Sequence, residues 1–169
     1  MTNVTNSSES EWINGCINRG TDAVELSGWS VQYASAAGST WQVTTLSGTL
    51  QPGYYYLVQE AQGTGGTEPL PSPDAIRTIA LGASNGKVAL VPHITALTGN
   101  CPSGTSIVDL VCFGSTANCY EGSGPTLTLT NTTATKRLKN GCTDNGEPGS
   151  GDSIAITVWN KGWRSVFLQ

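Results

Sequence analysis

The feature that most constrains the fold is a run of alternating side chains in "WSVQYAS", residues 29–35. Trp29, Val31 and Tyr33 are separated by small or polar residues. Because successive side chains of a β-strand point to opposite faces, this spacing places the three large residues on one face. The stretch therefore predicts a strand whose apolar face packs in a core and whose other face is polar.

Short segments of similar character recur along the chain, and each is bounded by Gly, Pro or Asn. They are "STWQVTTLSGTL", "QPGYYYLVQEA", "AIRTIALG", "GKVALVP" and "TSIVDLVCFG". The first two are predicted to follow residues 29–35 as consecutive antiparallel strands. The chain also has 21 Gly and 8 Pro and lacks long runs of helix formers. The prediction is an all-β protein, a sandwich or a barrel.

The length of 169 residues suits one domain, which we divide into three parts. Residues 1–10 form a polar N-terminal segment and residues 11–144 form the sandwich. Residues 145–169 form a tail, in which residues 154–158 alternate as a strand and Asn160-Lys161-Gly162 offers a turn. The tail is predicted to be an edge strand or a hairpin.

Charge and targeting signals narrow the partners. Only 12% of residues are charged and the net charge is −4, so direct nucleic-acid binding is not expected. No run reaches the roughly 20 apolar residues of a membrane span, and the polar start carries no signal peptide. Five cysteines and the Asn-x-Ser/Thr sequences at Asn3, Asn6 and Asn131 nevertheless resemble an exported protein. We expect an extracellular or cell-surface location.

Residues suited to catalysis are scarce. The single histidine, His93, has no nucleophile motif beside it and is expected to be an exposed loop residue. Asp109 interrupts an otherwise apolar strand, so it is either a functional carboxylate or one that accepts backbone N–H groups. We expect no enzymatic activity.

Metal and cofactor signals are weak as well. Residues 144–152 offer oxygen ligands, including Asp144 and Asp152, but lack the spacing of an EF-hand. The cysteines form no close Cys-x-x-Cys pair of the kind found in zinc sites. Neither a metal nor a cofactor is expected.

The cysteines suggest one disulfide. Cys101 and Cys119 flank a predicted strand, and a bridge between them would contribute roughly 3 kcal/mol by closing the intervening loop. Cys112 lies within that strand and is expected to be a small buried hydrophobe. Cys16 and Cys142 have no assigned partner.

The aromatic residues permit two interpretations. A row of Trp and Tyr on a sheet face can stack on a sugar ring, and the same residues can fill a core. We assign Trp29 to the core and take Tyr54, Trp41 and Trp163 as candidate ligand contacts. A carbohydrate-binding sandwich is therefore an alternative function.

Several motifs together resemble the lamin tail domain, in particular its bacterial branch. In "NRGTDAVELSGWSVQY" an Asn-x-Gly turn leads to Leu-Ser-Gly-Trp and an alternating strand, as in that family. The matching positions are Asn18, Gly20, Val24, Leu26, Ser27, Gly28 and Trp29. The stretches "GTLQPGYYYLVQEAQGTGG" and "CPSGTSIVDLVCFGSTANCYEGSGP" are also similar, and the resemblance covers about residues 11–144.

The resemblance implies an immunoglobulin-like antiparallel β-sandwich without catalytic residues. Such a module helps to attach or position an exported or cell-surface protein, through a protein or another surface component. A further alternative is a fragment of a secreted hydrolase that lacks its catalytic part. The family's bacterial pattern also contains cysteines at the positions of Cys101 and Cys119.

Two departures from the family pattern lead to structural expectations. The polar segment of residues 1–10 stands where the family has its first strand, and we expect residues 154–158 to pair at the sheet edge that this strand would leave. The Asn14-Gly15 pair stands where the family has an acidic-apolar alternation. It is expected to form a turn or bulge that damages the strand.

Overall fold

A computed structural model describes residues 12–61, 72–104 and 106–120, together with residues 125, 128, 134–135 and 154–160. The regular elements among these residues are all β-strands, so the all-β prediction is confirmed. The strands are β1 (Trp12–Asn18), β2 (Val24–Glu25), β3 (Ser30–Ala34), β4 (Gln42–Thr45), β5 (Thr49–Leu50), β6 (Tyr55–Gln59), β7 (Ala75–Ile76), β8 (Gly86–Val91), β9 (Asp109–Phe113), β10 (Ala134–Thr135) and β11 (Ile154–Asn160).

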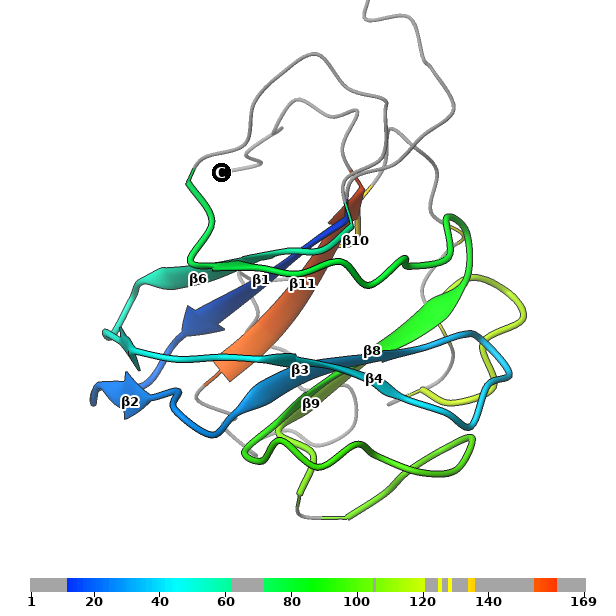
Figure 1. The fold of residues 1–169 in the computed structure, drawn as a ribbon, viewed down its shortest axis with the longest axis horizontal. Helices are drawn as coiled ribbons and strands as arrows, with labels where there is room; N and C mark the ends of the chain where they lie inside the picture. The colour runs from blue at the N-terminus through cyan, green and yellow to red at the C-terminus, as the bar shows by residue number, and fades with distance from the viewer. Residues whose placement is uncertain are drawn as a thin grey trace, which may run out of the picture.

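Two large sheets form the layers of a β-sandwich. The five-stranded sheet has the order β10-β11-β1-β6-β7 and the four-stranded sheet has the order β4-β3-β8-β9. In Figure 1, β6, β1 and β11 lie in the upper layer, and β3, β8 and β9 lie in the lower layer. Strands β2 and β5 form a separate small sheet. All pairings are antiparallel except that of β6 with β7.

The main core lies between the two large sheets and takes alternate residues from each. The five-stranded sheet contributes Cys16, Tyr56 and Val58, and the four-stranded sheet contributes Val31, Tyr33, Val88, Leu90, Val111 and Phe113. Trp29 packs half-buried against this cluster, in line with its assignment to the core. Full burial of one such side chain contributes about 1.5–3 kcal/mol, so this cluster is a principal source of stability.

The sequence predicts that β3, β4 and β6 are consecutive antiparallel strands, which is correct for β3 and β4 and wrong for β6. Strand β4 pairs with β3, but β6 lies in the other sheet and pairs with β1. The chain crosses between the sheets after β4, where the short β5 pairs with β2. Leu46 and Leu50 are buried in the core along this crossing, which stabilises the change of sheet.

The expectation of a break at Asn14-Gly15 is wrong. Both residues lie within a continuous ladder: Asn14 pairs with Val58 and Val158, and Gly15 pairs with Leu57 and Thr157. Strand β1 has neighbours on both sides, and two ladders of hydrogen bonds outweigh the local preference of Asn-Gly for a turn.

The tail strand lies beside β1. Strand β11 pairs with the whole of β1, from Trp12 opposite Asn160 to Asn18 opposite Ile154. On its other side it pairs with β10, so it is not at the edge of the sheet. The second half of the predicted tail hairpin lies outside the described residues.

Candidate functional site

The outward side of the five-stranded sheet carries a strip of apolar residues. Along β6 the side chains alternate between the two faces. Tyr56 and Val58 are buried in the core, whereas Tyr55 is 61% exposed and Leu57 is half-buried. Ile17 of β1 stands opposite Tyr55 and is also half-buried. On β7, Ile76 is 57% exposed. We call Ile17, Tyr55, Leu57 and Ile76 the outward strip.

Hydrogen bonds on both sides of Ile76 hold this part of the strip in place. The Asp74 carboxylate accepts from the Leu57 N–H (2.7 Å), and the Asp74 N–H donates to the Leu57 carbonyl (2.8 Å). Beyond Ile76, the Arg77 N–H donates to the Gln59 carbonyl (2.8 Å). The strip therefore lies on paired strands rather than on a loose loop, as a binding surface requires.

Tyr54 lies next to the strip and is 68% exposed. It follows a tight turn in which Gly53 has a φ of 77°, a conformation that favours glycine. The Gly53 N–H donates to the Asn18 carbonyl (2.7 Å), and the Asn18 N–H donates to the Tyr54 carbonyl (3.1 Å). These two bonds attach the turn to the end of β1.

The Asn18 side chain completes this attachment and is fully buried. Its Nδ2 donates to the carbonyls of Asp22 (2.8 Å) and Leu50 (2.9 Å), and its Oδ1 accepts from the Gly20 N–H (2.9 Å). One amide thus satisfies three backbone groups and joins β1, β5 and the segment before β2.

A loop covers the outward side of the four-stranded sheet. We call residues 92–101 the cover loop. Ser30 Oγ donates to the His93 carbonyl (2.6 Å), and Gln32 Nε2 donates to the Thr95 carbonyl (2.9 Å). Gln32 Oε1 in turn accepts from the Leu97 N–H (2.8 Å). Strand β3 is therefore buried on both faces, including the face that carries the polar Ser30 and Gln32.

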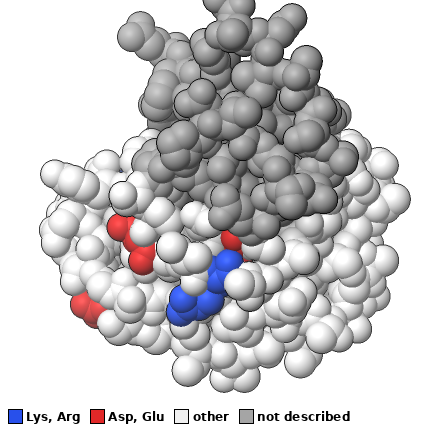
Figure 2. All heavy atoms as spheres, turned by 45° about the horizontal axis from the view of Figure 1, so that its top comes forward, with Lys and Arg blue, Asp and Glu red and all other residues white. Residues whose placement is uncertain are grey.

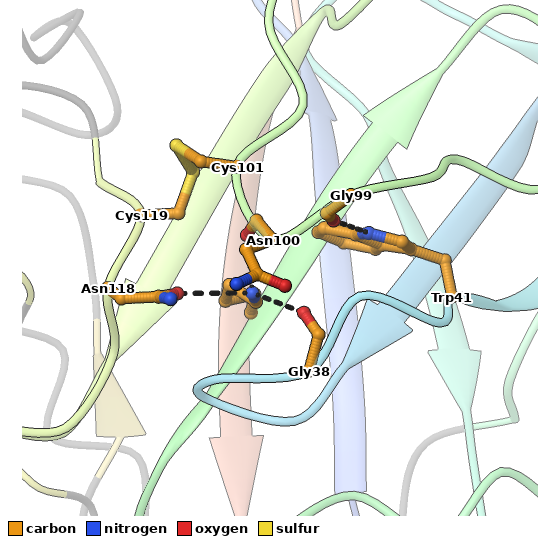
Figure 3. Close-up of a disulfide and its surroundings, with 8 residues drawn as sticks. Gly38, Trp41, Gly99, Asn100, Cys101, Asn118 and Cys119 are labelled. Atoms are coloured by element: carbon orange, nitrogen blue, oxygen red, sulfur yellow. Dashed lines mark hydrogen bonds between the residues drawn. A yellow bond between two sulfur atoms is a disulfide. The ribbon is translucent and has the colours of Figure 1, made fainter.

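Trp41 and Lys87 hold the far end of the cover loop. Figure 3 shows Trp41 beside Gly99. Trp41 is only 4% exposed and its Nε1–H donates to the Gly99 carbonyl (3.1 Å), so its assignment as an exposed ligand contact is wrong. The Lys87 ammonium donates to the carbonyls of Gly38 (2.8 Å) and Asn100 (2.5 Å) and to Asn118 Oδ1 (3.3 Å). It also lies 5.6 Å from the centroid of the Trp41 ring. Burial lowers the pKa of Lys87, and these acceptors favour its charged form.

Cys101 and Cys119, the pair that the sequence favours, form a disulfide next to Asn100 and Asn118, two of the Lys87 acceptors. Figure 3 shows the bond. Cys119 is buried and Cys101 is exposed. Cys119 belongs to a second apolar cluster, separate from the main core, that also contains Trp41, Leu110 and Cys112. Cys112 is a buried thiol, as predicted.

The buried acidic residues take part in internal contacts. Glu60 accepts from Thr44 Oγ1 (2.5 Å) and from the Ile79 N–H (3.3 Å), and burial raises its pKa. Asp109 is 4% exposed, and its charge adds to the effect of burial in raising the pKa of Cys16 to about 12. Asp109 alternates along β9 with Leu110 and lies on the same face as Val111 and Phe113, which belong to the main core.

His93 is half-buried rather than exposed, which corrects the expectation for this residue. Its Nδ1 is a buried nitrogen without a hydrogen-bond partner. Within the described residues, no group of three or more His, Cys, Asp or Glu side chains is placed to hold a metal ion.

Three sequence-based candidates lie outside the described residues: Trp163, the acidic run at residues 144–152 and Cys142. Among the described residues on the face seen in Figure 2, charged side chains are sparse. Among the described residues there is also no helix with the length and apolar character needed to span a bilayer.

Comparisons with protein-family models, with curated proteins and with solved structures found no match for this chain.

Sequence reasoning missed three residues that organise these regions. Asn18 was noted only as part of a turn motif, although it binds three backbone groups. Gln32 and Lys87 were treated as ordinary strand residues. A lysine within the apolar run "GKVALVP" was a usable signal, because a buried lysine requires several acceptors.

Proposed function

We propose that this domain is a lamin-tail-like, immunoglobulin-like β-sandwich that serves as a non-catalytic interaction or anchoring module. The outward strip, with the neighbouring Tyr54, forms its contact surface. The observation that carries the proposal is the exposure of Tyr55 and Ile76, each above one half, on strands held by hydrogen bonds. Exposed apolar side chains on the same face of a rigid sheet are typical of an interaction surface.

The lamin-tail motif residues have structural roles that fit this proposal. Asn18 joins β1 to the Tyr54 turn, and Gly28 has a φ of 88° in the turn before Trp29. These roles maintain the scaffold and leave the contact surface to other residues. An exported or cell-surface location is supported by the Cys101–Cys119 disulfide, because such bonds persist in oxidising environments.

The proposal is tested by sedimenting the domain with washed bacterial cell-envelope fragments. Replacing both Tyr55 and Ile76 with Ser removes the strip's most exposed apolar groups, and we expect the affinity to fall about tenfold or more. The matched control replaces Ile94 and Tyr120 with Ser. These two residues are 57% and 46% exposed, and they lie on loops outside the strip. Equal binding by both double variants, or no binding by the wild-type domain, would contradict the proposal.

A carbohydrate-binding function is the second candidate, favoured by the 68% exposure of Tyr54. An aromatic ring held by a tight turn can stack on the apolar face of a sugar. A glycan array with wild type and Tyr54→Ser separates the two functions. Sugar binding that Tyr54→Ser abolishes supports this candidate, whereas the absence of binding to every sugar rules it out.

A further inference from the structure

The cover loop is held to the sheet mainly through its backbone. Ser30, Gln32 and Trp41 bind backbone groups of His93, Thr95, Leu97 and Gly99, and Lys87 binds the carbonyl of Asn100. A loop lying on a sheet without such partners would bury unsatisfied N–H and C=O groups. The closed position of the loop therefore depends on these side chains, together with a β-bridge between Thr40 and Thr98.

Two of the three Lys87 acceptors are adjacent in sequence to the disulfide. Asn100 precedes Cys101, and Asn118 precedes Cys119. The bond between the two cysteines, drawn in Figure 3, thus holds both acceptors at the ammonium group of Lys87. Because a buried charge is costly without its acceptors, the disulfide and Lys87 depend on one another.

The apolar residues under the loop form their own cluster. Trp41, Leu110, Cys112 and Cys119 belong to it, whereas the main core between the sheets consists of other residues. Regions with separate cores can open separately, with free energies below that of global unfolding.

We propose that the Cys101–Cys119 disulfide is a redox-controlled latch. Its reduction by a dithiol releases the cover loop from Lys87 and opens the outward side of the four-stranded sheet, while the main core stays folded. The inference is independent of the proposed contact surface, which lies on the other sheet.

The reduction step uses the exposed cysteine. A thiolate of the dithiol attacks Sγ of Cys101, the S–S bond breaks, and Cys119 leaves as a thiolate that takes up a proton. The second thiol of the reductant then attacks the mixed disulfide, which releases Cys101 as a thiol and leaves the reductant oxidised. Two electrons pass from the dithiol to the protein disulfide.

Hydrogen–deuterium exchange of the full chain, with and without dithiothreitol, tests the latch. On reduction we expect the Leu97 amide to exchange about tenfold faster or more, because the bond to Gln32 opens with the loop. Amides of β6 should keep their exchange rates. The Cys101→Ser/Cys119→Ser variant should reproduce the reduced pattern without reductant. Unchanged exchange at Leu97, or equal acceleration in β6, overturns the proposal.

Two single variants test the coupling to Lys87. In Lys87→Met the loop should be loosened while oxidised, so reduction should accelerate Leu97 exchange by a smaller factor than in the wild type. Ser30→Ala is the matched control, since it removes the bond to the His93 carbonyl and an acceptor of Gln32 Nε2 but leaves Lys87 and its three acceptors in place. In this variant reduction should give the wild-type factor. If reduction accelerates Leu97 exchange by the same factor in Lys87→Met as in Ser30→Ala, Lys87 does not couple the disulfide to the loop.

Discussion

The replacement of Asn18 with Ala removes three hydrogen bonds from a fully buried position. The bonds to Asp22, Leu50 and Gly20 are 2.8–2.9 Å long, and the Leu50 carbonyl is left without this donor in the interior. Each bond contributes about 1 kcal/mol net, so we expect the free energy of unfolding to fall by about 3 kcal/mol. With a urea m-value of about 2 kcal/mol/M, the midpoint should fall by about 1.5 M.

Asn18→Asp distinguishes the donor role of Asn18 from its acceptor role. An aspartate keeps the acceptor for the Gly20 N–H, but it can donate to the carbonyl of Leu50 only when protonated. Burial and this donation raise its pKa in the folded state above the unfolded value of about 3.9. The folded state then binds more protons, so stability falls as the pH rises through the interval between the two pKa values.

Urea denaturation followed by tryptophan fluorescence measures both variants at acidic and neutral pH. Asn100→Ala is the matched control, because Asn100 is exposed and its carbonyl remains for Lys87. The free energy of unfolding of this control should stay within about 0.5 kcal/mol of the wild-type value. An alanine variant that is as stable as this control, or an aspartate variant as stable as wild type at neutral pH, would refute the reasoning.

Two further predictions follow from buried titratable groups. Burial raises the pKa of Glu60, so wild-type stability should fall as the pH rises from about 4.3 through the raised value, and Glu60→Gln should flatten this dependence. Urea denaturation across that pH range measures the stability of both proteins. A wild type that becomes more stable relative to Glu60→Gln as the pH rises would contradict the prediction. Since the pKa of Cys16 is about 12, iodoacetamide at about pH 8 should label this thiol only after unfolding, as mass spectrometry of the labelled peptides can show. Rapid labelling of native Cys16 would exclude its burial.

The period-two pattern predicted the strands and the core face of β3, because both depend on neighbouring residues. It could not predict the cover loop, which brings His93 to Ser30 across 63 positions of sequence. From the sequence alone, Ser30 and Gln32 look like residues of a solvated face. The structure shows that they are polar because they bind a loop backbone.

Local signals also failed where neighbouring strands decided the outcome. Asn14-Gly15 has the composition of a turn, yet it lies in a strand that is paired on both sides. Trp41 and Tyr54 are both candidate ligand contacts from the sequence. Trp41 is buried because Gly99 and Lys87 lie against it, whereas Tyr54 is exposed by the turn at Gly53.

The two outward faces of the sandwich reverse the usual distribution of polarity. On the four-stranded sheet, the polar Ser30, Gln32 and Lys87 are buried, because they satisfy the backbone of the cover loop or the residues beside it. On the five-stranded sheet, Tyr55 and Ile76 are exposed although they are apolar. Polar burial has a structural explanation in the loop contacts. The contacts among the described residues give the exposed apolar side chains no such explanation, and for this reason we propose the five-stranded sheet as the interaction surface.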